Sequence, residues 1–198
     1  MTRFSGTIED MAKSGYHHGD LRATILAAAA DQIASDGVDA VSLRELARRA
    51  GVSHAAPAHH FGDRAGVLTA LAIEGFDLLA ARLGQAGDDF REVAVAYIRF
   101  AREHPGHFDV MFRHSLLRAG EPRLDEARAR AASALRSGVS AIHPDDAQRQ
   151  RAAQLAAWSL VHGFAALWRE GALDNSSLAA DADPETVARR MLATVRFD

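Results

Sequence analysis

The chain has 198 residues, of which 48% are hydrophobic and 25% charged, and its formal net charge is −3. That composition is typical of a globular protein, and the length allows either one large core or a small domain joined to a larger one. Because the sequence contains no cysteine, disulfide bonds and cysteine-ligated metal sites are excluded.

Residues 1–18 are predicted to form a flexible N-terminal arm. Its start, MTRFSGTIED, is polar and lacks the apolar core of a secretory signal peptide, which favours a cytoplasmic protein. A first helix is predicted to begin near Asp20, where the helix dipole favours an anion, and to end at Asp36-Gly37. Its inward face carries apolar residues at four-residue steps: Leu21, Ile25, Ala29 and Ile33.

A helix-turn-helix motif is predicted over residues 42–61. Ser42 and Glu45 have the spacing of a capping box, which begins a helix. Gly51 can adopt positive φ and so ends that helix, and Ser53 is predicted to cap a second, shorter helix that runs to about His60. The spacing of helix, glycine turn and capped helix is that of a DNA-reading motif, although an ordinary αα-hairpin has similar features.

The stretch Tyr16–Leu68 resembles the DNA-binding domain of the TetR family of transcriptional regulators. The segments that carry the resemblance are GDLRATILAAAADQIASDG and VSLRELARRAGVSHAAPAHHFGDRAGVL. The resemblance implies an all-α protein with a three-helix DNA-binding domain over residues 19–64. A helical ligand-binding and dimerisation domain would follow over residues 65–198. It also implies a homodimeric repressor of a palindromic operator in double-stranded DNA.

The residues predicted to contact DNA lie in and beside the motif. The N–H groups at the two helix starts can hold phosphates, while the second helix offers histidines to guanine and alanine methyl groups to thymine. The resemblance adds the first residue of the next helix, an arginine where the family usually has lysine. It also shows that an alanine replaces the family's usual tyrosine, at Ala58. The set is Ser42, Arg44, Arg48, Ser53, His54, Ala55, Ala58, His59 and Arg64.

The predicted DNA-binding domain is not basic overall, because six basic and six acidic residues lie between Lys13 and Arg64. DNA binding would therefore depend on the placement of charges, on helix N-termini and on the avidity of a dimer. This neutrality leaves an alternative open. The chain could be a helical small-molecule-binding protein or an enzyme whose helix-turn-helix no longer reads DNA.

An effector site is predicted among helices of the second domain. One helix is expected from Arg64 to Leu83 and the next from about Phe90 to the break at His104-Pro105-Gly106. The segment AYIRFAREHPGHFDVMF resembles one found in a TetR subgroup. Resemblance and periodicity together indicate a pocket for an unknown, apolar or aromatic effector. Its predicted residues are Tyr97, Phe100, Met111, Phe112, Trp158 and His162. Plain core packing is the alternative role for these side chains.

The sequence from Pro122 to about Ile142 predicts a helix whose arginines alternate with acidic residues, which favours a solvated face. The following segment, AAQLAAWSLVHGFAALW, is apolar on too many faces to pack only within its own subunit. Its Trp158, His162 and Gly163 have the spacing of the WHG-type regulatory domain of the TetR family. With a final helix from Pro184 to Arg196 it is predicted to form a dimeric four-helix bundle, although it could instead be the core helix of a monomer. The predicted interface comprises Ala157, Leu160, Gly163, Phe164, Leu167, Met191 and Val195.

No motif for a catalytic site, metal site or cofactor is present, and none of the three is expected. Adjacent helix residues point about 100° apart, so His59 and His60 cannot readily chelate one ion. The histidines at 104, 107 and 114 are interpreted as solvated helix-end residues. The uncharged stretch between Arg151 and Arg169 contains Gln154 and His162 and is interpreted as a buried helix, so no membrane association is expected.

Overall fold

The computed structural model describes residues 9–137, 146–174, 176–177 and 182–195. Every regular element in these residues is a helix, as the sequence predicts. The elements are α1 (Glu9–Asp36), η1 (Val38–Ala40), α2 (Leu43–Ala50), α3 (Ala56–Phe61), α4 (Arg64–Gln85), α5 (Phe90–Glu103), α6 (Pro105–Met111), η2 (His114–Leu116), α7 (Pro122–Ser137), α8 (Ala147–Arg169) and α9 (Pro184–Thr194). No helix in the described residues is long and apolar enough to cross a membrane.

Side-chain caps fix where most of these helices begin. The Ser42 hydroxyl accepts a hydrogen bond from the backbone N–H of Glu45 over 3.3 Å, so the predicted start of α2 is confirmed. Asp89 caps α5 in the same way, through the N–H of Arg91 at 2.8 Å. Asp146 accepts from two N–H groups at the start of α8, each at 3.0 Å. These starts depend on bonds between residues two or three apart, which is why the sequence reveals them.

Two predicted helix starts are wrong. The first helix begins at Glu9 rather than near Asp20, so much of the predicted N-terminal arm is helical. Ser53 does not cap α3, which begins at Ala56 after Ala55, a residue with no capping side chain. A helix capped by Ser53 would place Pro57 where a backbone N–H must donate to the cap carbonyl. The observed start moves proline into the first turn, where no N–H is needed.

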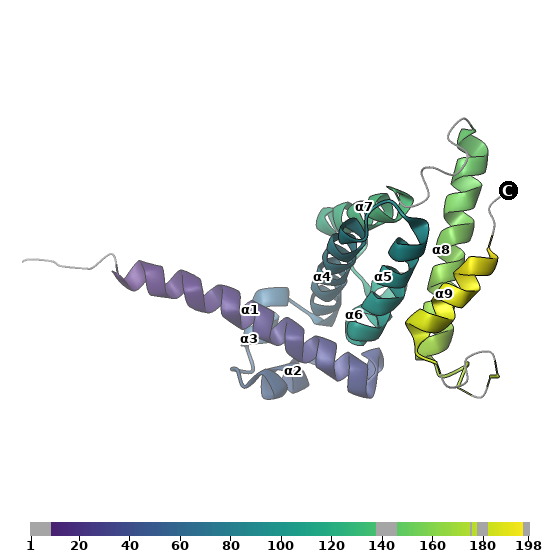
Figure 1. Ribbon diagram of the computed structural model, residues 1–198. Coiled ribbons are helices and arrows are strands. Elements are labelled where there is room, and N and C mark those ends of the chain that lie inside the picture. The colour runs from purple at the N-terminus through teal and green to yellow at the C-terminus, as the bar shows by residue number, and fades with distance from the viewer. Residues whose placement is uncertain (1–8, 138–145, 175, 178–181, 196–198) are drawn as a thin grey trace, which may run out of the picture.

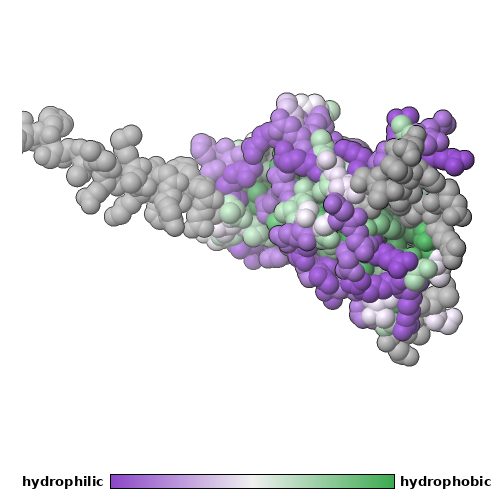
Figure 2. All heavy atoms as spheres, turned by 45° about the horizontal axis from the view of Figure 1, so that its top comes forward, coloured by the Kyte–Doolittle hydropathy of each residue, from purple (hydrophilic) through white to green (hydrophobic). Residues whose placement is uncertain are grey.

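The helices form two parts (Figure 1). The smaller part, called the reading head below, consists of α1, α2 and α3, and the remaining helices form a larger bundle. Helices α1, α2 and α3 lie at one end, where α1 packs against α2 through a core that includes Ile25, Ile33 and Leu46. Helices α8 and α9 lie at the opposite end, and both pack against α5. Helix α4 joins the two parts because it contacts α1 and α3 as well as α6 and α7. On the face in Figure 2, hydrophilic side chains surround narrow apolar patches.

Two glycines let α6 pack closely between α1 and α4. A Cβ at Gly106 would lie 2.1 Å from the carbonyl oxygen of Ala30, so only glycine allows this approach of α6 to α1. A Cβ at Gly75 would lie 2.7 Å from the sulfur of Met111, on the α4 side of the same helix. Because interiors are close-packed, a shift of α6 must be transmitted to both neighbours. Helix α6 is thus in direct mechanical contact with the reading head.

Candidate nucleic-acid interface and ligand cavity

The turn between α2 and α3 has the predicted geometry. Gly51 has φ of 66° and ψ of 31°, the left-handed conformation that glycine adopts without strain. The N–H of Val52 then donates to the carbonyl of Ala47 over 3.0 Å and closes the end of α2. Ala47 is fully buried, so its small side chain allows α3 to cross α2 closely. The helix-turn-helix prediction is therefore confirmed at its corner.

The outer surface of α3 and of the turn before it is formed by short side chains and two histidines. Five of the residues predicted to contact DNA are exposed there, namely Ser53, His54, Ala55, Ala58 and His59. Three others, Ala56, Pro57 and Phe61, are buried against the rest of the head. An exposed surface so poor in long polar side chains can contact thymine methyl groups and offer imidazoles to guanine. It has no arginine, asparagine or glutamine to form bidentate hydrogen bonds with a base.

The arginines of α2 are not equally free. Arg48 donates from two nitrogens to the Glu45 carboxylate, over 2.8 and 2.5 Å, and Arg49 donates to the same group over 2.9 Å. These bonds lower the pKa of Glu45 to about 2. Arg44 is exposed, and no described residue forms an ion pair with it. Arg44 is therefore the α2 cation most readily available to a phosphate.

Arg64, a predicted phosphate contact, forms hydrogen bonds within the protein. Its Nε donates to the carbonyl of Val41 over 3.0 Å, and a terminal nitrogen donates to the carbonyl of Val38 over 2.7 Å. The same guanidinium lies 3.8 Å from Asp39. The Arg64 guanidinium thus joins the start of α4 to η1, and its contact with a DNA phosphate stays a prediction.

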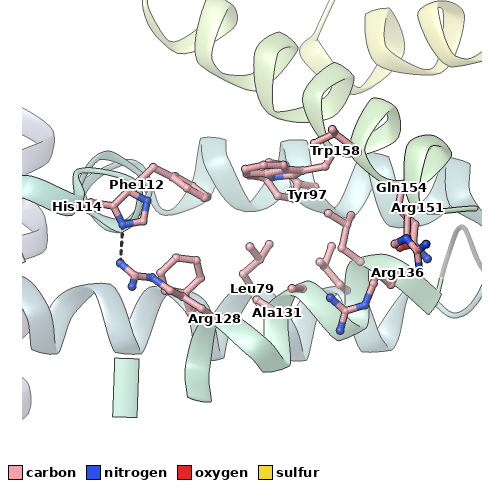
Figure 3. Close-up of a pocket in the computed structure, with 15 residues that line it drawn as sticks. Leu79, Tyr97, Phe112, His114, Arg128, Ala131, Arg136, Arg151, Gln154 and Trp158 are labelled. Carbon is pink, nitrogen blue, oxygen red and sulfur yellow. Dashed lines mark hydrogen bonds between the residues drawn. The ribbon is translucent and has the colours of Figure 1, made fainter. Parts of the chain in front are cut away.

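A cavity of about 400 Å³ lies among α4, α5, α7 and α8 (Figure 3). This volume is within the range of small-molecule sites. Three of the six predicted effector contacts line the cavity, namely Tyr97, Phe112 and Trp158. They come from three different segments of the chain. Sequence periodicity assigns each to a buried face of its own segment, and the fold then brings the three side chains to one cavity.

Two residues predicted to contact the effector, Phe100 and Met111, lie in the core and not in the cavity wall. Phe100 is fully buried and its ring packs beside His104, with centroids 5.1 Å apart. Met111 is also fully buried, because its side chain fills the space beside Gly75. Neither residue lines the cavity. Both belong to the core packing that was the alternative interpretation of these side chains.

His162 lies behind the cavity wall and connects its aromatic residues. Its Nδ1 is 2.9 Å from the Tyr97 hydroxyl, and its ring centroid is 4.5 Å from that of Phe112 and 5.8 Å from that of Trp158. Burial lowers the pKa of His162 and raises that of Tyr97. At neutral pH the protonated phenol can therefore donate to the neutral imidazole. The bond to Tyr97 and the ring contacts with Phe112 and Trp158 thus join these side chains through His162.

The sequence missed most of the cavity wall. Apolar residues that line it include Phe76, Leu79, Leu83, Ala131, Leu135 and Leu155. The polar part of the wall consists of His114, Arg128, Arg136, Arg151 and Gln154. The α7 arginines were interpreted as a solvated face, because their alternation with acidic residues gives no sign of the helix that faces them. Arg136 is exposed, as that interpretation requires, but both Arg128 and Arg136 also border the cavity.

The α8 surface partly matches the predicted dimer interface. Ala157 and Phe164 are buried within the protomer, the former beside Phe90 and the latter in the main core, so these two assignments are wrong. Gly163 has an open side, with no atom within 4 Å of a Cβ placed there, and 46% of Leu167 is exposed. Leu160, Met191 and Val195 are half-buried. The described residues contain no cluster of three or more side chains that could hold a metal ion.

Family comparisons support the division into a reading head and a bundle. Residues 25–71 match the model for bacterial regulatory proteins of the tetR family, and residues 90–195 match the model for the tetracyclin repressor-like C-terminal domain. The second match alone spans more than half of the chain. The chain belongs to the TetR family. As a TetR-family protein it is a ligand-responsive, DNA-binding transcriptional regulator, and this family fold is that of a regulator rather than an enzyme.

Solved structures give the same fold. A protein of unknown function from Rhodococcus sp. RHA1 is 34% identical, with 90% of this chain and 95% of that chain covered and a TM-score of 0.71. A tetR-family regulatory protein from Rhodococcus RHA1 is 22% identical, with 87% and 93% covered and a TM-score of 0.68. AibR, solved with isovaleryl coenzyme A and operator DNA, is 17% identical, with 88% and 97% covered and a TM-score of 0.65. No protein of curated function matches the sequence.

Proposed function

We propose that this TetR-family regulator is a cytoplasmic homodimeric repressor that binds a palindromic operator and releases it when a small molecule enters the cavity. The observation that carries the proposal is the combination of an exposed helix-turn-helix with a separate, partly apolar cavity about which α4, α7 and α8 meet. In a dimer the two recognition helices would enter successive major grooves, about 34–36 Å apart. A change in that spacing would lower affinity for the operator.

The dimer proposal rests on the surface of α8. Among the described residues, four large hydrophobic side chains are more than a third exposed, and three of them, Leu155, Trp158 and Leu167, are on this helix. Gly163 lies on the same face as Leu167, with its open side uncovered by the protomer. Because Leu155 and Trp158 also line the cavity, the surface left for a partner is the one around Gly163 and Leu167, where the glycine admits close approach by a helix from a second copy.

The proposed response passes from the cavity to the head through α4, α6 and η2. Phe112 and His114, which line the cavity, directly follow α6, and Phe76, Leu79 and Leu83 line it from α4. Helix α6 touches α1 at Gly106 and α4 at Gly75. An effector that moves these walls would therefore displace α4, the helix that joins the bundle to the reading head. Coupling between two such sites is typically 1–3 kcal/mol.

The test is a titration of the protein against labelled DNA from the region upstream of its own gene, at several salt concentrations. We expect tight binding to a fragment that contains an inverted repeat, and weaker binding as salt rises. Arg44→Ala should weaken binding to all sequences and lower the salt slope by about one. The matched control is Arg91→Ala, which removes an exposed arginine from α5 and should change nothing.

A different result would support the alternative function. If no upstream fragment binds in a salt-dependent manner, or if Arg44→Ala and Arg91→Ala behave alike, the repressor proposal is wrong. The near-neutral charge of the head would then mark a helical ligand-binding protein that no longer reads DNA.

A further inference from the structure

The polar part of the cavity wall has only one sign of formal charge. Three arginines, Arg128, Arg136 and Arg151, line the cavity, and no described lining residue is aspartate or glutamate. The rest of the wall is mainly aliphatic and aromatic. Charges of one sign beside a low-dielectric wall focus the field inside a cleft, so this cavity attracts anions.

The arginines lie at two ends of the cavity (Figure 3). At one end, Arg128 donates to Nδ1 of His114 over 2.9 Å and to Asp125 over 3.3 Å, while its Nε is buried without a hydrogen-bond partner among the described residues. At the other end, Arg136 of α7 and Arg151 of α8 lie near Gln154. Both of these arginines are exposed, and no described carboxylate pairs with either. Among the described residues, no carboxylate occupies their donors, so we take them as the groups that a ligand would meet.

Between the two ends runs an apolar path. In the view of Figure 3, Leu79 and Ala131 lie on one side, and the aromatic residues Phe112, Tyr97 and Trp158 lie on the other. The length of this path separates Arg128 from the Arg136–Arg151 pair. A ligand that fits must bury an apolar body along the path and place an acidic group at the paired arginines, where a planar guanidinium matches carboxylate or phosphate geometry.

We propose that the effector is an amphipathic organic anion, with its apolar body between Leu79 and Trp158 and its acidic group held by Arg136 and Arg151. This inference rests on the proposed function only in taking the cavity as the effector site. It differs from the sequence prediction of an apolar or aromatic effector, because the two arginines can bind an acidic group that a neutral hydrocarbon lacks.

The test uses three probes with one ten-carbon chain and different head groups: decanoate, decanol and decylamine. Binding to the full-length protein without DNA is followed by the fluorescence of Trp158, with Trp168→Phe removing the signal of the other tryptophan. We expect decanoate to bind at least about tenfold more tightly than decanol, since hydrogen bonds to charged groups are worth more than neutral ones. Decylamine should bind least. Decanoyl coenzyme A, as a fourth probe, distinguishes a phosphate-bearing thioester from a free acid as the source of the anion.

The double variant Arg136→Gln with Arg151→Gln should weaken decanoate binding about tenfold and leave decanol binding unchanged. Arg130→Gln is the matched control, because Arg130 also projects from α7 but pairs with Asp77 and does not line the cavity. Equal affinity for the acid, alcohol and amine, no binding of any probe, or an unaltered double variant would each overturn the proposal. The repressor proposal fails separately, through the absence of DNA binding when no effector is present.

Discussion

Arg118 donates a hydrogen bond to Oδ1 of Asp63 over 3.0 Å, and the same nitrogen donates to the carbonyl oxygen of Phe61 over 2.9 Å. Phe61 ends α3 and Asp63 caps α4, so one side chain from the bundle holds the junction between the recognition helix and the connecting helix. Arg118 also follows η2, which begins at the cavity residue His114. This contact is a direct link from the cavity wall to the reading head.

Removing this link with Arg118→Ala should loosen the α3–α4 junction. The N–H of Gly66 donates to Asp63 over 2.7 Å, and that bond and Arg118 together hold the Asp63 pKa below its usual range. Without Arg118 the cap loses its support, so we expect amide hydrogen exchange around residues 62–66 to rise several-fold. Hydrogen exchange with mass spectrometry would measure it.

The control for that variant is Arg113→Ala, because Arg113 is exposed and donates only within its own turn, to the carbonyl of Asp109. If both variants exchange alike at the junction, Arg118 does not support it. In the presence of an effector, Arg118→Ala should also reduce the change in operator affinity, since less of the cavity's movement would reach α4.

Gly106→Ala should destabilise the fold more than Gly75→Ala. The new Cβ at 106 would meet a backbone carbonyl, which can move only if α1 and α6 separate. The new Cβ at 75 would meet the flexible end of Met111, which can change rotamer. We expect losses of about 2–4 and 1–2 kcal/mol in the free energy of unfolding, respectively. Urea denaturation measures both, and equal losses would argue against the close α1–α6 contact.

The accuracy of the sequence analysis followed the range of the interactions involved. The Ser42 cap and the Gly51 corner depend on residues within one turn, and both were predicted. The cavity arginines were missed because their role depends on α8 facing α7, which no local pattern encodes. Phe100 and Tyr97 lie on the same apolar stripe of α5, yet only Tyr97 reaches the cavity. Periodicity identifies the buried face of a helix, but it does not show whether a residue on that face packs against a neighbouring helix or lines a cavity.

The protein should lose stability as the pH falls below about 6.5. Burial lowers the pKa of His162, and burial together with the neighbouring His107 lowers that of His104. The unfolded chain therefore binds protons at a pH where the folded protein does not, so stability is complete above the unfolded pKa and declines as the pH falls towards the folded values. Thermal unfolding from pH 8 to 5 tests this.

His162→Gln removes one of these titrating groups and keeps a polar side chain near Tyr97. We expect a shallower fall in the melting temperature between pH 7 and 5 than in the natural protein. His54→Gln, a change at an exposed histidine of the reading head, serves as the control and should leave the slope unaltered. An unchanged slope for His162→Gln would show that protonation of this ring does not oppose folding.

Gly163→Ala should separate the stability of the protomer from that of the dimer. A glycine inside a helix costs about 1 kcal/mol relative to alanine, and a Cβ at 163 meets nothing within the protomer. The monomer should therefore become more stable. If α8 packs against its twofold mate at this glycine, the added methyl group must push the two helices apart, and the dimer dissociation constant should rise about tenfold or more.

Gly84→Ala is the matched control for this prediction, because Gly84 is also helical and open but lies on α4. Both variants should raise monomer stability in dilute solution, whereas only Gly163→Ala should shift the monomer–dimer equilibrium in sedimentation experiments. A dimer that tolerates alanine at 163 as well as at 84 would place the interface elsewhere. The Leu167 side chain, 46% exposed on the protomer, would then need another partner.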